Sequence, residues 1–154
     1  MPLLLRRVRN ELQGFTLIEV LIALVIMSVG MLGIAGLYVH SMQAGRTSLL
    51  RHNAVTLAGD VADRIRANPK AAAAYVGAGA NNNCVAAGIN CSAAQMASHD
   101  IWLWDQQAAD SLPNGAVAIV LNNAVVPPTY QITVNWTEPG ETPSYSVTIP
   151  VSDK

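Results

Sequence analysis

One uncharged apolar run constrains the fold of this chain more than any other feature. From Val20 to Val39, 20 consecutive residues carry no charged side chain. A helix of that length measures about 30 Å at roughly 1.5 Å per residue, which matches the hydrocarbon thickness of a bilayer. The segment therefore predicts a membrane-spanning helix.

The residues before this run predict its orientation. Arg6, Arg7 and Arg9 precede it, and basic residues favour the cytoplasmic side of a membrane. We therefore expect a cytoplasmic N-terminus, with the residues after about His40 outside the cytoplasm. An ordinary secretory signal has its small cleavage residue after the apolar part, whereas here the small residue, Gly14, comes before it.

A second helical pattern follows the apolar run. Asp60 and Arg64 are spaced to form an i,i+4 ion pair, and Pro69 is expected to end the helix. Apolar residues recur every three or four positions, which predicts one buried stripe: Leu50, Ala54, Leu57, Val61 and Ile65. If the helix is continuous over 15–67, it is about 80 Å long.

The next part of the chain predicts a loop and a second helix. The Gly- and Asn-rich residues 71–92 have no regular period and are expected to form a loop, although residues 71–74 could extend a short helical turn. Ser92 and Gln95 match a capping box at the start of a helix over about 93–110. The sequence LPNG at 112–115 is expected to stop that helix.

The C-terminal part alternates between apolar and polar residues, which is typical of strands. Residues 116–121 form a short apolar run, and residues 130–136 and 145–151 alternate with a period of two. The sequence EPGE at 138–141 suits a turn between the last two strands. The head is therefore predicted to be α+β, with a small antiparallel sheet and one additional helix beside the long helix.

Two cysteines lie in the predicted loop. Cys84 and Cys91 are separated by six residues, and an oxidising compartment permits a disulfide between them. Such a bond would stabilise the fold by roughly 2–3 kcal/mol in the chain-entropy model. A pair of free thiols is the alternative. A structural zinc site is not expected, because it needs four ligands.

Charge and histidine placement argue against several function classes. The 154-residue chain has a net charge of −1, and without residues 1–14 (three Arg, one Glu) the charge is −3. No basic patch remains for nucleic acid. His40, His52 and His99 have no metal-ligand spacing, so we expect no metal, no cofactor and no enzymatic activity. His99 and Asp100 are expected to form a solvated start of the 93–110 helix.

The segment GFTLIE, at residues 14–19, resembles the class III signal of type IV prepilins and pseudopilins. The resemblance implies that a prepilin peptidase cuts between Gly14 and Phe15 and that Phe15 is then N-methylated. A glycine without Cβ can enter a tight active site. The resemblance also implies that Glu19 pairs with the new terminal amine of a neighbouring subunit. Such a pairing explains the presence of a carboxylate whose insertion deep in a bilayer is unfavourable by about 2.5–3.5 kcal/mol.

Three weaker features resemble the minor pilins called type IV pilus modification proteins, PilV type. They are VADRIRANP at 61–69, the spacing of the two cysteines, and a tryptophan followed by LPNG. The resemblance implies a pilin fold with a cleaved leader (1–14), a transmembrane or filament-core helix half (15–39), an amphipathic half (40–68) and a periplasmic head (69–154).

The implied function is initiation or assembly of the pilus fibre, and hence twitching motility and adhesion. The implied partners are prepilin peptidase, other minor pilins, the major pilin and the inner-membrane assembly platform. The protein would cross the inner membrane once before it enters the fibre. A minor pseudopilin of type II secretion is one alternative, and a periplasmic binding module on an uncleaved anchor is another.

Overall fold

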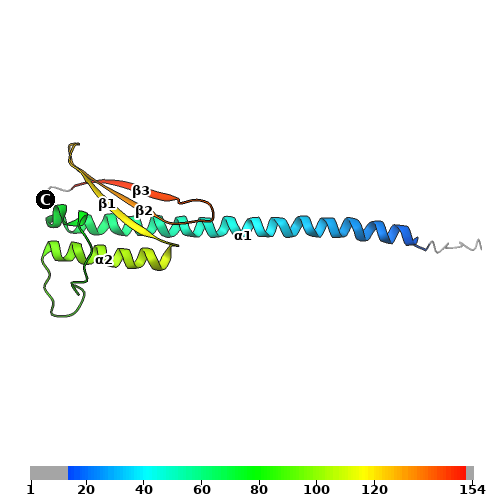
Figure 1. Cartoon of the computed structure of the whole chain (residues 1–154), viewed down its shortest axis with the longest axis horizontal. Coiled ribbons are helices and arrows are strands. Elements are labelled where there is room, and N and C mark those ends of the chain that lie inside the picture. Colours follow the sequence, from blue (N-terminus) through cyan, green and yellow to red (C-terminus); the bar gives the residue numbers. More distant parts are fainter. Residues whose placement is uncertain (1–13, 152–154) are drawn as a thin grey trace, which may run out of the picture. The chain divides into compact units, whose positions relative to one another are not determined.

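The computed structural model describes residues 14–151, so the predicted leader up to residue 13 lies outside the described part. The chain divides into two units between Gln43 and Ala44. Its elements in chain order are α1 (Leu17–Ala67), the 3₁₀ helix η1 (Pro69–Val76), α2 (Ala93–Ser111), β1 (Ala116–Asn122), β2 (Thr129–Asn135) and β3 (Ser144–Pro150) (Figure 1).

The first unit contains the apolar part of α1. Every described side chain from residue 14 to residue 43 is exposed. The most apolar 18-residue window of α1 has a mean hydropathy of 2.6, and α1 is long and apolar enough to cross a membrane. The helix begins at Leu17, two residues later than predicted.

The second unit begins with the amphipathic half of α1. The predicted stripe is confirmed: its five residues are all buried, together with Ala58 and Ala62. Asp60 pairs with Arg64 at 3.2 Å, as predicted. The helix ends at Ala67, immediately before Asn68 and Pro69. The helical turn allowed at residues 71–74 is present as part of η1, and Pro69 suits the first position of such a helix.

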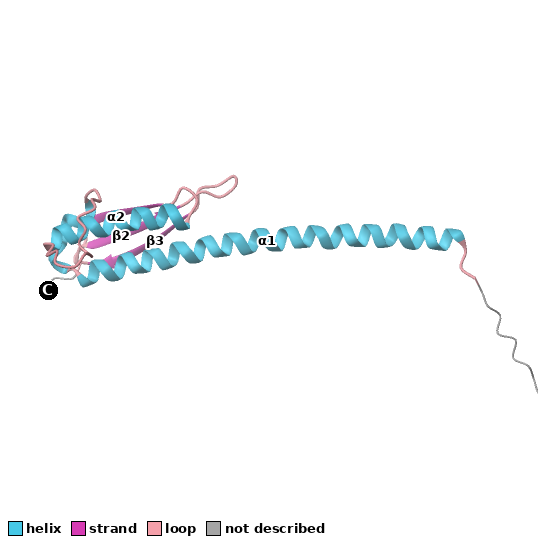
Figure 2. Ribbon diagram, turned by 90° about the horizontal axis from the view of Figure 1, so that it is seen from below, coloured by secondary structure: helices cyan, strands magenta, loops and turns pink. Residues whose placement is uncertain are grey.

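Helix α2 runs alongside this part of α1 (Figures 1 and 2). The Nδ2 of Asn53 donates to the carbonyl oxygen of Ser111 at 3.2 Å. The predicted capping box is present, because Ser92 and Gln95 each accept the other's backbone N–H. Leu112 lies just after the helix end and is buried, as is Trp104 within the helix.

The sheet is antiparallel with the strand order β1-β2-β3. Ile132 in the central strand lies between Ile119 of β1 and Val147 of β3. The alternation is confirmed in β2, where the buried side chains are Tyr130, Ile132 and Val134. The turn after β2 has Gly140 at φ 87°, a conformation that glycine adopts without strain. The predicted α+β pilin fold is therefore confirmed.

The prediction for His99 and Asp100 is wrong. The two residues are buried, with only 2% and 4% of their surface exposed. Segment 78–80 lies on this part of α2: the N–H of Ala80 donates to the Ser98 carbonyl oxygen at 2.9 Å. His99 stacks on Trp102, and Asp100 faces groups from α1 and η1. Tertiary contacts thus cover residues that a sequence pattern places at an exposed helix start.

Candidate functional site

The first candidate site is the segment from Gly14 to Glu19. Gly14, Phe15 and Thr16 are not helical, and Thr16 immediately precedes α1. The carbonyl oxygen of Thr16 accepts the N–H of Glu19 at 3.1 Å, and its Oγ1 accepts the same N–H at 3.3 Å. Thr16 therefore caps α1. This capping role was not predicted from the sequence, although Thr-x-x-Glu is the spacing of a capping box.

Glu19 lies in the first turn of α1. The side chain is exposed, and its carboxylate has no ion-pair partner among the residues that the structure describes. The N-terminal end of a helix carries a partial positive charge, which favours an acidic side chain there by about 0.3–1 kcal/mol. The fold thus tolerates this carboxylate locally and leaves it available to a group from outside the chain.

Gly14 has no steric role in the described structure. A Cβ placed on Gly14 would meet no atom within 4 Å. Phe15, on the other side of the predicted cleavage point, is 85% exposed. The fold of this chain therefore gives no reason for a glycine at position 14. The same is true of Gly30, Gly33 and Gly36 within α1, where an added Cβ would also meet open space.

A polar cluster joins α1, η1 and α2 in the head. The Arg64 guanidinium contacts Asp100 Oδ1 at 3.1 Å and Asp60 Oδ2 at 3.2 Å. Burial disfavours the Arg64 cation, but the charges of Asp60 and Asp100 outweigh this effect and raise its pKa. The Nε1 of Trp104 donates to Asp60 at 3.2 Å. The segment VADRIRANP thus supplies contacts that hold the second helix against the first.

Tyr75 completes this cluster from η1. Its hydroxyl donates to Asp100 Oδ2 at 3.2 Å and accepts from Asn68 Nδ2 at 3.2 Å. The Asn68 amide also donates to the Ala93 carbonyl oxygen at 2.9 Å. Burial raises the pKa of Tyr75 to about 12. The cluster is therefore satisfied internally and acts as a structural connection between three elements.

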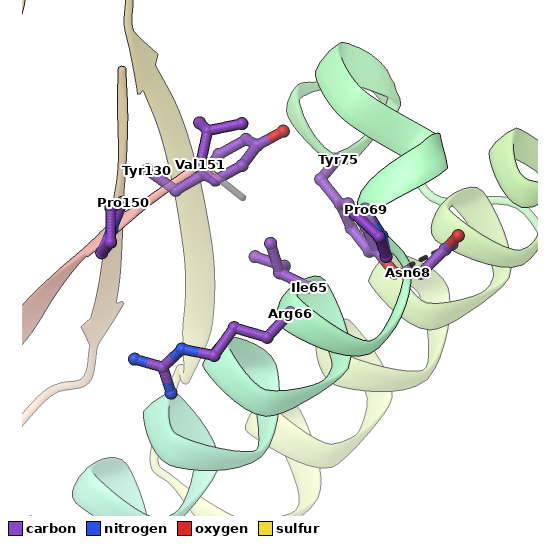
Figure 3. A pocket seen from close by; sticks show the side chains of 8 residues that line it. All are labelled: Ile65, Arg66, Asn68, Pro69, Tyr75, Tyr130, Pro150 and Val151. Carbon is purple, nitrogen blue, oxygen red and sulfur yellow. Dashed lines mark hydrogen bonds between the residues drawn. The ribbon is translucent and has the colours of Figure 1, made fainter. Parts of the chain in front are cut away.

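A small pocket lies beside this cluster, between the end of α1, η1 and the strand ends (Figure 3). Tyr75, Pro69 and Ile65 form one side, and Tyr130 and Val151 face them. The Arg66 side chain, which also lines the pocket, pairs with Asp63 at 2.9 Å. The walls are mostly apolar, and the pocket therefore has no arrangement of groups typical of catalysis.

The predicted disulfide is present. Cys84 and Cys91 are bonded with a Cα–Cα distance of 5.7 Å. The loop is also attached to α2 independently of this bond, because Asn82 Nδ2 donates to the Gln95 carbonyl oxygen at 2.9 Å. A Cβ on Gly79 would lie 2.6 Å from the backbone nitrogen of Trp102. A glycine is therefore needed where the loop crosses α2.

A second polar contact joins the sheet to α1. The Glu138 carboxylate accepts hydrogen bonds from Trp136 Nε1 at 2.8 Å and from Thr47 Oγ1 at 2.7 Å. These two hydrogen bonds, followed by the charges of Arg51 and Arg46, lower the pKa of Glu138. The turn after β2 is thereby attached to α1 close to the point where the stripe of buried residues begins.

The apolar part of α1 is fully exposed, and its amphipathic part contributes to the core of a small head with an antiparallel sheet. This arrangement is typical of a pilin-like protein. The chain matches the family "Type IV pilin Tt1218" over residues 36–102. It also matches the prokaryotic N-terminal methylation motif over residues 11–35. Over residues 11–102 the chain is therefore similar to type IV pilins and to their N-terminal methylation motif.

The pilin-family match ends within α2 and the methylation-motif match ends within α1, so the sheet lies outside both. No curated protein and no solved structure matches the chain. The methylation motif and the apolar helix together fit a membrane-anchored pilin that is later assembled into a pilus.

Proposed function

We propose that this chain is a minor pilin of a type IV pilus, which takes part in initiating or assembling the fibre. Twitching motility and adhesion would then depend on it indirectly. The observation that carries the proposal is the methylation motif over residues 11–35, positioned at the start of an apolar helix that the fold leaves uncovered. A helix of this kind needs lipid or other helices around it.

The processing steps follow from the same motif. Prepilin peptidase cuts between Gly14 and Phe15, and Phe15 is N-methylated. Two observations support this assignment: the cleavage point is exposed and non-helical, and Gly14 has no role in the fold of this chain. A peptidase needs an extended, accessible backbone, whereas a helix shields its own peptide bonds.

The proposed role of Glu19 is to pair with the terminal amine of a neighbouring subunit. Its support is the exposed carboxylate without an ion-pair partner among the described residues. In a filament core of low dielectric, two opposite charges attract far more strongly than in water. The proposed partners are other minor pilins, the major pilin and the inner-membrane assembly platform.

Before assembly, the proposed location is the inner membrane, with a cytoplasmic N-terminus and a periplasmic head. The disulfide supports a head outside the cytoplasm, because thiols in the cytoplasm are kept reduced. After assembly the protein would lie in the fibre at the cell surface.

Deletion of the gene tests the pilus assignment. Sheared surface pili and twitching should decrease, and re-expression should restore both. Unchanged pili with lost protein secretion would instead assign the chain to a type II secretion system, whose minor pseudopilins share the same leader and helix.

Mass spectrometry of the mature protein tests processing, since an N-terminus at methylated Phe15 is expected. An unprocessed chain that starts at Met1 would contradict both pilin assignments and favour an anchored binding module.

A further inference from the structure

The connection between α2 and β1 contains the one Asn–Gly pair of the sequence, Asn114 and Gly115. Asparagine is among the chemically labile residues of proteins. In an Asn–Gly pair the backbone nitrogen of the glycine can attack the side-chain amide carbon of the asparagine, because no glycine side chain shields that nitrogen. This pair is therefore a candidate site of spontaneous covalent modification.

The fold requires both residues of the pair. Residues 112–115 form a turn, which the N–H of Gly115 closes by donating to the Leu112 carbonyl oxygen at 3.0 Å. Asn114 is the third residue of this turn and has a φ of 50°. A type II turn needs a positive φ at that position, and asparagine tolerates it better than most residues. A Cβ on Gly115 would overlap the Ala108 carbonyl oxygen, so the next position accepts only glycine.

The folded turn restrains the reaction between these two residues. The Gly115 nitrogen must release its proton for the attack, and in the turn this N–H is bonded to the Leu112 carbonyl oxygen. The Asn114 amide donates to Thr137 Oγ1 at 3.4 Å, and the Thr137 N–H donates to the Pro113 carbonyl oxygen at 2.8 Å. Leu112 is buried and anchors the turn in the head. The attack therefore requires the turn to open locally.

We propose that Asn114 is a deamidation site whose rate is set by local opening of the turn at residues 112–115. In the open turn the Gly115 nitrogen bonds to Cγ of Asn114 and loses its proton. The Cγ–Nδ2 bond breaks, and the amide nitrogen leaves as ammonia with that proton. A water molecule then adds to one carbonyl carbon of the resulting cyclic imide and breaks the C–N bond there, which yields aspartate or isoaspartate. No electrons pass to or from another group, and water is the co-reactant.

Both products disturb the closed turn. Isoaspartate carries the main chain through the former side chain and so lengthens the backbone by one carbon atom. Because the backbone at Gly115 already lies against Ala108, the longer chain does not restore the hydrogen bond that closes the turn. Aspartate keeps the backbone length but places a negative charge beside the C-terminal end of α2, which is unfavourable. Deamidation therefore marks chains in which this part of the head has opened. The proposal does not depend on the proposed function, since it concerns the head alone.

Peptide mass spectrometry of the full-length protein in detergent tests this proposal. The protein is incubated at mildly alkaline pH, and the peptide that contains Asn114 is followed for the mass gain that replacement of an amide by a carboxylate produces. Deamidation should be at least about tenfold slower in native buffer than in urea, because the reaction requires the open turn. Equal rates in the two conditions would overturn the restraint by the fold, and an unmodified peptide in urea would overturn the site itself.

Two variants test whether the opening is local. Leu112→Ala removes the buried anchor of the turn and should raise the native rate several-fold. The matched control is Ile149→Ala in β3, which also empties a buried position but lies outside the turn and should leave the native rate nearly unchanged. All three proteins should react equally fast in urea. A native rate that rises equally in both variants would show that the whole head must unfold, and would contradict the proposal.

A milder variant keeps the test decisive if Leu112→Ala does not fold. Thr137→Val removes the hydrogen bond that the Asn114 amide donates and leaves the backbone contacts of the turn in place. It should also raise the native rate while the rate in urea stays the same. A native rate that neither variant raises would contradict control by the turn.

Discussion

Asp100 and Arg64 join α2 to α1 through a contact of 3.1 Å in which the two partners differ greatly in exposure. The Asp100 side chain is 6% exposed, whereas the Arg64 side chain is 46% exposed. Removing one partner therefore has a different consequence from removing the other. Loss of the arginine leaves a buried carboxylate without its cation and lowers the stability of the fold. Loss of the carboxylate leaves an arginine that water can solvate.

This asymmetry gives the first prediction. Arg64→Met should destabilise the head by about 1–3 kcal/mol, since it leaves Asp100 buried without its charged partner. Asp100→Asn should destabilise the head by less than about 1 kcal/mol, because the amide keeps a hydrogen-bonding group and Arg64 reaches solvent. Urea unfolding of the full chain in detergent, followed by tryptophan fluorescence, measures both. Equal losses for the two variants would contradict this account.

Tyr75 gives a prediction at alkaline pH. Its pKa is raised from 10.0 to about 12 in the folded state. A group with a raised folded pKa contributes stability that is present below its unfolded pKa and is lost as the pH rises through the folded pKa. The free energy of unfolding should therefore fall between pH 10 and 12. Tyr75→Phe should show a smaller fall over this range, and an identical slope in both proteins would argue against the role of Tyr75.

Glu138 gives the opposite dependence at acidic pH. Hydrogen bonds from Trp136 and Thr47 lower its pKa below 4.5. Its contribution is therefore present above the unfolded pKa and is lost as the pH falls through the folded value. Thr47→Val should reduce this loss of stability, with Thr56→Val, on the exposed part of α1, as the matched control. The measurement is the midpoint of thermal unfolding from pH 6 down to pH 3.

Glu19 separates processing from assembly. Glu19→Ala should leave cleavage after Gly14 largely intact, because the residue lies within α1 and not at the cleavage point. The amount of the variant in sheared pili should fall, since the terminal amine of the neighbouring subunit would have no carboxylate with which to pair. Glu19→Gln, which keeps the shape, should behave like Glu19→Ala. Wild-type amounts of either variant in pili would refute the proposed pairing.

Gly14 tests the first processing step. Gly14→Val should leave the head unchanged, because a Cβ at this position meets no atom within 4 Å. Cleavage should be lost or strongly reduced, since a branched side chain would enter the peptidase at the cut. The matched control is Gly115→Ala, whose Cβ would be within 3.0 Å of Ala108 and should destabilise the head without blocking cleavage. The mass of the chain in membranes reports cleavage for both variants.

Much of the fold could be predicted from the sequence because the decisive interactions are local. Ser92 and Gln95 fix the start of α2 within four residues of chain. The buried side chains of β2 follow from a period of two, and the α1 stripe follows from helical spacing. Each of these patterns is complete within one element.

The parts that could not be predicted depend on contacts between distant segments. Asp100 contacts Tyr75 and Arg64, which are 25 and 36 residues away in sequence, and no local pattern reveals such contacts. The same is true of Glu138 and Thr47, which are separated by 91 residues. Thr16 is the exception, because its capping role is local and its spacing to Glu19 could have revealed it.

The buried stripe of α1 has a consequence for the order of folding. Seven residues from Leu50 to Ile65 belong to the core of the head, and Ile132 and Ile149 of β2 and β3 belong to the same core. The helix is synthesised long before the strands that cover it. During that interval the nascent chain exposes the apolar stripe of α1 in addition to its apolar N-terminal half. The contacts between α1 and the strands are non-local and therefore form slowly. Chaperones, or the lipid interface itself, should therefore matter most before β3 has been made.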